Sequence, residues 1–131
     1  MSRPVAAMAF LATFTMFAPA ARAHHSGAMF DDKKEVTLTG TIKEFQYTNP
    51  HSWLLVDVKG PDGKVTTWGF EAEGPTTLLR AGIRRTDLMP GMEVIITGHP
   101  MRDGRPAATL TKATRLSDRK EFIPASGFAV K

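Results

Sequence analysis

Alternation of apolar and polar side chains is the feature that most constrains the fold of this chain. From Val36 to Lys43, every second residue is apolar or glycine, and the residues between them are threonine or lysine. A period of two is typical of a β-strand with one buried face. Similar runs recur along the chain, and turn sequences such as Gly60-Pro61-Asp62-Gly63 separate them. The pattern predicts five strands, over residues 35–47, 52–58, 64–71, 92–98 and 107–116.

One short helix is expected among these strands. Residues 74–82 have a proline near their start, Pro75, and a glycine at their end, Gly82, which is the usual asymmetry of a helix. The expected order is three strands, a helix and two strands. This is the order of the OB-fold, a mainly-β, five-stranded Greek-key barrel with a helix between strands three and four. An open β-sandwich, or a meander with a capping helix, is the alternative.

The first 23 residues have the layout of a secretory signal peptide. Arg3 gives a positive start, residues 5–18 form an uncharged and mostly apolar run, and Ala21-Arg22-Ala23 is a small-x-small cleavage site. The apolar run is shorter than the ~20 residues that a helix needs to cross a bilayer, which argues against a membrane anchor. We expect cleavage after Ala23, export to the periplasm and a mature protein that does not span the membrane.

Cleavage would change both the length and the net charge of the protein. Removal of 23 residues from 131 leaves 108, and the loss of Arg3 and Arg22 lowers the formal net charge from +4 to +2. This mild basic excess no longer suggests a nucleic-acid partner. The chain has no cysteine, which excludes disulfides, thiolate metal sites and cysteine nucleophiles. The mature chain divides into an N-terminal arm, a barrel and a C-terminal tail, over residues 24–34, 35–116 and 117–131.

The four histidines are candidate metal ligands, and two of them begin the mature chain. Cleavage would place His24 at the amino terminus, where its α-amine and imidazole can chelate one metal ion as a histidine brace. His25 adds a second imidazole. Nitrogen donors of this kind favour Cu(II), Ni(II) or Zn(II), and copper has the highest intrinsic affinity. A solvated, frayed chain start is the alternative for this pair.

The other two histidines lie beside expected strands. His51 is at the entry to the second strand, and His99 precedes Pro100 and Met101 at the end of the fourth. His51 could instead hydrogen-bond within its turn, and Met101 could offer a thioether to copper or fill a gap in the core. If strands one and four pair antiparallel, the N-terminal arm approaches His99. The copper donors would then be His24, His25, His51, His99 and Met101.

Three aromatic residues on strands two and three offer a second kind of site. Trp53, Trp68 and Phe70 could form a stacking platform like those on which OB-folds bind oligosaccharides and oligonucleotides. Barrel core is the alternative for all three. Glu71 and Glu73, near the end of strand three, could be paired carboxylates or two exposed acids.

The chain resembles a family of small exported bacterial proteins of unknown function. The resemblance rests on His24-His25-Ser26, on Asn49-Pro50-His51-Ser52-Trp53, and on His99-Pro100 followed by Arg102-Asp103-Gly104. It extends to about Leu116 and implies an exported OB-like barrel without an assigned activity. Further matching segments are Met29-Phe30-Asp31, residues 36–41, Trp68 and residues 88–91. The chain departs from the family at Gly82-Ile83, where Gly-Trp is common, and at Met89-Pro90-Gly91-Met92, where Lys-Pro-Gly-Asp is common.

These observations favour a binding protein over an enzyme. The sequence has no nucleophile–base pair, phosphate loop or cofactor motif. The first hypothesis is a periplasmic β-barrel that binds copper or another transition metal through its histidines. The alternative is a non-enzymatic OB-like module that binds a peptide, a glycan or an envelope protein across Trp53, Trp68 and Phe70.

Overall fold

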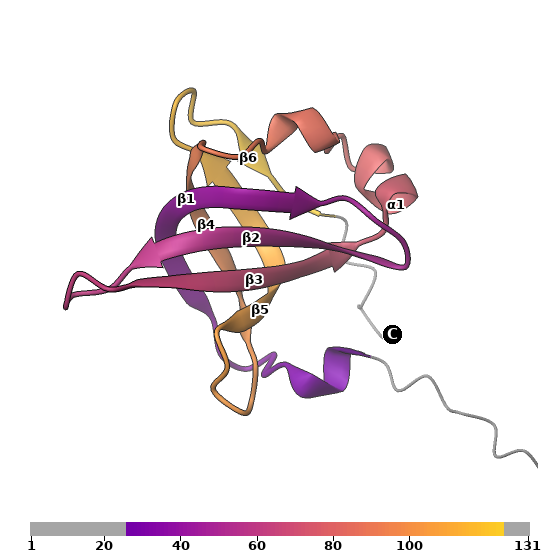
Figure 1. The fold of residues 1–131 in the computed structure, drawn as a ribbon. Helices are drawn as coiled ribbons and strands as arrows, with labels where there is room; N and C mark the ends of the chain where they lie inside the picture. Colours follow the sequence, from indigo (N-terminus) through magenta and orange to yellow (C-terminus); the bar gives the residue numbers. More distant parts are fainter. Residues whose placement is uncertain (1–25, 125–131) are drawn as a thin grey trace, which may run out of the picture.

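A computed structural model describes residues 26–124, which form a small β-barrel (Figure 1). A single α-helix, α1 (Pro75–Arg80), follows the third strand. Two short 3₁₀ helices, η1 (Ser26–Met29) and η2 (Arg85–Asp87), precede the first strand and the fourth. The strands are β1 (Val36–Gln46), β2 (His51–Lys59), β3 (Val65–Glu73), β4 (Glu93–Pro100), β5 (Ala107–Arg115) and β6 (Glu121–Phe122).

The sheet is closed by one parallel pairing. The strand order is β3-β2-β1-β4-β5-β6, and β3 also pairs with β5, so the first five strands form a barrel. Every other neighbouring pair is antiparallel. The predicted five-stranded OB-like barrel, with one helix between strands three and four, is therefore confirmed.

The predicted and observed strand boundaries differ by two residues at most, and so do those of α1. The pattern did not indicate η1, η2 or β6, because an element of two to four residues is too short to show a period. Among the residues that the structure describes, no helix is both long enough and apolar enough to cross a lipid bilayer.

The core lies inside the barrel and follows the predicted alternation. Four strands contribute completely buried side chains, among them Leu54, Val56, Phe70, Val94, Ile96 and Ala108, and Leu78 of α1 and Leu88 are completely buried as well. β1 reaches both halves of the barrel, since residues 36–41 pair with β4 and residues 41–46 pair with β2. A register shift between Ile42 and Glu44 accompanies this change of partner.

The N-terminal arm is fixed to the end of β4. Phe30 forms an isolated antiparallel bridge with Met101, and both residues are buried. The Asp31 N–H donates to the Pro100 carbonyl oxygen at 2.8 Å, and the Arg102 N–H donates to the Met29 carbonyl oxygen at 2.9 Å. Figure 1 accordingly shows η1 beside the loop between β4 and β5. The pairing of β1 with β4 thus brings the arm to His99, as the topology predicted.

Candidate functional site

His99 lies near the end of β4, where the arm is attached. Its Nδ1 is 2.7 Å from the carbonyl oxygen of Lys34. Because a carbonyl oxygen only accepts hydrogen bonds, Nδ1 carries the proton and the neutral ring keeps its lone pair on Nε2. A histidine held in this way by a backbone carbonyl is typical of metal ligands, since the hydrogen bond fixes both the tautomer and the ring orientation.

His51 begins β2 and contacts a buried carboxylate. Its Nδ1 is hydrogen-bonded to Oε1 of Glu71, whose side chain is only 4% exposed. The residue directly opposite His51 on β3 is Glu73, so Glu71 is its diagonal neighbour on the same face. The backbone of His51 also closes the preceding turn, because Thr48 Oγ1 donates to its carbonyl oxygen at 3.2 Å. The His51 side chain thus contacts Glu71, and its backbone contacts the turn.

The two histidines that the structure describes, His51 and His99, do not lie together. Going around the barrel from His99 on β4, β5 and β3 come before His51 on β2, which is three strand spacings or about 14 Å. Met101 is 9% exposed and pairs with Phe30. Within residues 26–124, no group of three or more His, Asp or Glu side chains could hold a metal ion. His24 and His25 lie outside the described residues.

The expected aromatic platform is not formed, because the three rings lie on two faces of the sheet. Trp68 and Phe70 point inward with Val56 and Leu54, their partners on β2. Phe70 is completely buried, and its ring stacks on that of Trp68 with centroids 6.2 Å apart. Trp53 faces outward, where its ring lies over Gly69. Side chains two positions apart on a strand point to the same face, so Trp68 and Phe70 both point into the core, whereas Trp53 points away from its neighbour Leu54.

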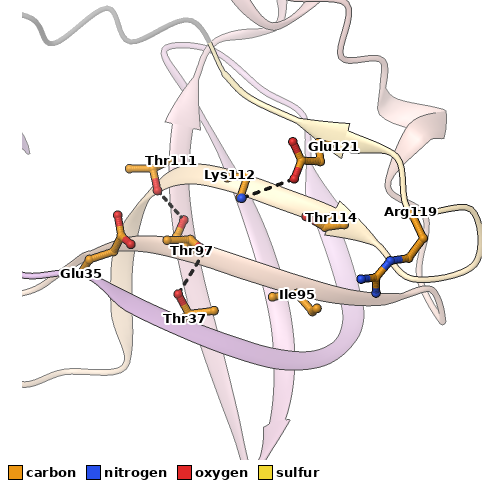
Figure 2. Close-up of a pocket in the computed structure, with 9 residues that line it drawn as sticks. All are labelled: Glu35, Thr37, Ile95, Thr97, Thr111, Lys112, Thr114, Arg119 and Glu121. Carbon is orange, nitrogen blue, oxygen red and sulfur yellow. Dashed lines mark hydrogen bonds and ion pairs between the residues drawn. The ribbon is translucent and has the colours of Figure 1, made fainter.

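A polar groove crosses the outer face of the sheet beside β6 (Figure 2). The Thr37 and Thr97 hydroxyls are 3.2 Å apart, and Thr111 Oγ1 donates to the Thr97 carbonyl oxygen at 3.0 Å. The lining is completed by Glu35, Ile95, Lys112, Thr114, Arg119 and Glu121. Lys112 Nζ is 3.4 Å from Glu121 Oε1. The groove combines hydroxyl groups with charges of both signs, which favours no single class of ligand.

The hairpin between β5 and β6 forms one end of this groove. Arg115 Nε donates to Asp118 Oδ1 at 2.9 Å, and the hydrogen bonds from Arg115 lower the pKa of Asp118 to about 2. Arg119, the next residue, has φ of 60°. Within the described residues it is the one non-glycine residue with a positive φ.

We predict that Arg119→Gly stabilises the protein. The left-handed conformation costs an L-residue roughly 1 kcal/mol, and glycine adopts it freely. The free energy of unfolding should therefore rise by about 0.5–1 kcal/mol in urea titrations. Arg119→Ala removes the same side chain but keeps the strained backbone, so it should give no such gain. Equal stabilisation by both substitutions would contradict this explanation.

The sequence analysis did not identify Thr109, and it left the role of Glu71 open. Glu71 lies on the outward face of β3, next to the core residue Phe70, and yet its side chain is buried. No pattern along β3 indicates this burial. Thr109 lies opposite Glu71 across the parallel β3–β5 pairing. Only the closure of the barrel brings these two residues together.

The fold and these positions define a small OB-like β-barrel domain. The model of a family of unknown function, DUF6152, matches residues 12–110. The chain belongs to this family, which confirms the resemblance to a family without an assigned activity. The comparisons with curated proteins and with solved structures gave no match.

Proposed function

We propose that this protein is exported to the periplasm and binds a late transition-metal ion at the end of β4. The preferred ion in this proposal is Cu(II). The ligands in this proposal are His99 and the amino terminus created by cleavage before His24. The observation that carries the proposal is the hydrogen bond from His99 Nδ1 to the carbonyl oxygen of Lys34. This bond leaves the lone pair of Nε2 available to a metal ion next to the anchored arm.

The arm supports this assignment because it limits where the amino terminus can be. Phe30 is anchored to Met101, and His24 precedes Phe30 by six positions. Six fully extended residues span at most about 20 Å, so His24 and His25 stay within that distance of the anchor. An α-amine, one or two imidazoles and His99 would make three or four nitrogen donors, a set that suits Cu(II).

The proposal leaves out two residues that the sequence suggested as ligands. Met101 is buried against the arm, so its thioether is engaged in packing. His51 is about three strand spacings from His99 and hydrogen-bonds to Glu71. The metal site we propose is therefore smaller than the five-donor set, and it depends on processing of the chain.

Copper titration of the processed protein tests the proposal. We expect Cu(II) to bind a chain that begins at His24 and to give nitrogen hyperfine structure in electron paramagnetic resonance. One additional residue before His24 removes the brace and should weaken binding at least tenfold in isothermal titration calorimetry. His99→Ala should weaken it similarly, because it removes one of the few donors.

His51→Gln is the matched control, since it removes an imidazole that lies outside the proposed site. It should leave the copper affinity unchanged in protein that circular dichroism shows to be folded. Equal copper affinity in the extended chain and in the chain that begins at His24 would overturn the brace. Mass spectrometry of the protein from the periplasm should in addition give a mature amino terminus at His24.

A further inference from the structure

The segment that connects β3 to β4 contains α1 and η2 and covers one end of the barrel. Its inward side chains, Leu78, Ile83 and Leu88, are completely or almost completely buried in the core. The Tyr47 hydroxyl donates to the carbonyl oxygen of Ile83 at 2.9 Å, which ties the segment to the end of β1. Figure 1 shows α1 and η2 at the opposite end of the barrel from η1. The outward side chains of this segment therefore stand on a well-anchored base.

These outward side chains combine positive charge with apolar groups. Leu79, Arg80, Arg84, Arg85 and Met89 are all exposed, and together we call them the arginine surface. Leu79 and Arg80 belong to the end of α1, Arg84 and Arg85 to the start of η2, and Met89 follows η2. A single short stretch of the chain thus presents three guanidinium groups and two large apolar side chains to solvent.

The charge of the arginine surface is not neutralised by the rest of the barrel. Asp87 is the one acidic residue between positions 74 and 92, and its Oδ1 lies 3.8 Å from Lys120 Nζ. Its Oδ2 accepts the backbone N–H of Arg84 at 2.7 Å. Within residues 26–124, the side chains of Arg80, Arg84 and Arg85 form no ion pair. Three neighbouring arginines without carboxylate partners create a positive potential that attracts an anionic partner.

The two apolar side chains decide which anionic partner fits best. Leu79 is 54% exposed and Met89 is 42% exposed, and they are two of the five large hydrophobic side chains that are exposed in the described part of the chain. A soluble polyanion would contact the guanidinium groups and gain little from leucine or methionine. An anionic phospholipid surface offers phosphate groups to the arginines and an apolar layer just below them to Leu79 and Met89.

We propose that the arginine surface binds the protein peripherally to an anionic phospholipid membrane. Arg80, Arg84 and Arg85 contact the lipid phosphate groups, and Leu79 and Met89 insert between the headgroups. Because η1 lies at the other end of the barrel, the N-terminal arm faces away from the membrane in this orientation. The proposal uses none of the proposed copper ligands, so either proposal can fail without the other.

Co-sedimentation of the folded protein with lipid vesicles tests the proposal. The protein should bind vesicles made of equal parts phosphatidylglycerol and phosphatidylcholine, and it should not bind vesicles of phosphatidylcholine alone. Added NaCl should weaken the binding, because salt screens exposed charges. Arg84→Gln combined with Arg85→Gln should weaken binding to the anionic vesicles roughly 20-fold, since each basic residue near such a surface contributes about fivefold.

The matched control removes the same charge from the opposite end of the barrel. Arg102 and Arg105, in the loop between β4 and β5, are exposed arginines that already form ion pairs with aspartates. Arg102→Gln combined with Arg105→Gln should leave vesicle binding nearly unchanged. An equal loss of binding in the two double variants would reduce the effect to net charge and overturn the proposal, as would wild-type protein that does not bind the anionic vesicles.

A third double variant separates a lipid surface from a soluble polyanion. Leu79→Gln combined with Met89→Gln keeps every charge and should weaken vesicle binding roughly tenfold through the lost apolar contact. The same variant should bind soluble polyphosphate as the wild-type protein does. If it instead bound anionic vesicles as tightly as the wild type, the arginine surface would be a site for polyanions in general and the membrane proposal would be wrong.

Discussion

Replacement of Gly98 by alanine is expected to destabilise the barrel by about 3 kcal/mol or more. A Cβ atom at this position would lie 2.0 Å from the carbonyl oxygen of Thr109. Because the obstructing atom belongs to the backbone of β5, β4 and β5 would have to separate. Gly98 stands at the register shift that follows Thr97, where the two backbones approach closely. Urea denaturation of the purified variant measures the effect.

Gly91→Ala is the control for the loss of a glycine. Gly91 has φ of 87°, and no atom lies within 4 Å of a Cβ built on it. The expected loss is then limited to the left-handed conformation, about 1 kcal/mol. A loss for Gly98→Ala no greater than that for Gly91→Ala would show that the strands can relax around an added methyl group.

Phe70→Ala is expected to lower the free energy of unfolding by about 3–5 kcal/mol. Phe70 is completely buried in the barrel core and stacks on Trp68, so its removal leaves a cavity that rigid strands fill poorly. Calorimetry should give a melting temperature lowered by well over 10 °C, since a domain of this size loses roughly 4–8 °C per kcal/mol.

Val65→Ala is the matched control, because Val65 is the first residue of the same strand, β3. Val65 is 62% exposed, so its truncation should change stability by no more than about 0.5 kcal/mol. If Phe70→Ala were as stable as Val65→Ala, Phe70 could not be a core residue, and the aromatic platform would have to be considered again.

The alternation in the sequence predicted the strands well, because each strand has one face in the barrel core. The polar Thr37 and Thr39 mark the outer face of β1, and Val36 and Leu38 mark the inner one. The same rule could have assigned the aromatic residues correctly. Trp53 lies one position from the core residue Leu54, whereas Trp68 and Phe70 share a face and so had to be inside together.

The candidate sites were less predictable, because they depend on contacts across strands that are distant in sequence. The approach of the arm to His99 followed from the expected pairing of strands one and four. The separation of His51 from His99 could not be predicted from that pairing, because it depends on β3 and β5 lying between them. No local pattern indicates that His51 binds Glu71 or that Glu71 meets Thr109.

The sequence by itself predicted the five long strands, the helix α1 and the family, because periodicity, turn residues and motifs are local properties of the chain. The order of these elements indicated an OB-like barrel over an open sandwich. It also restricted any metal chemistry to nitrogen, oxygen and thioether donors, since there is no cysteine. The tertiary structure decided which side chains meet. Barrel closure through the parallel β3–β5 pairing sets the register that buries Glu71, aligns it with Thr109 and keeps the two described histidines apart.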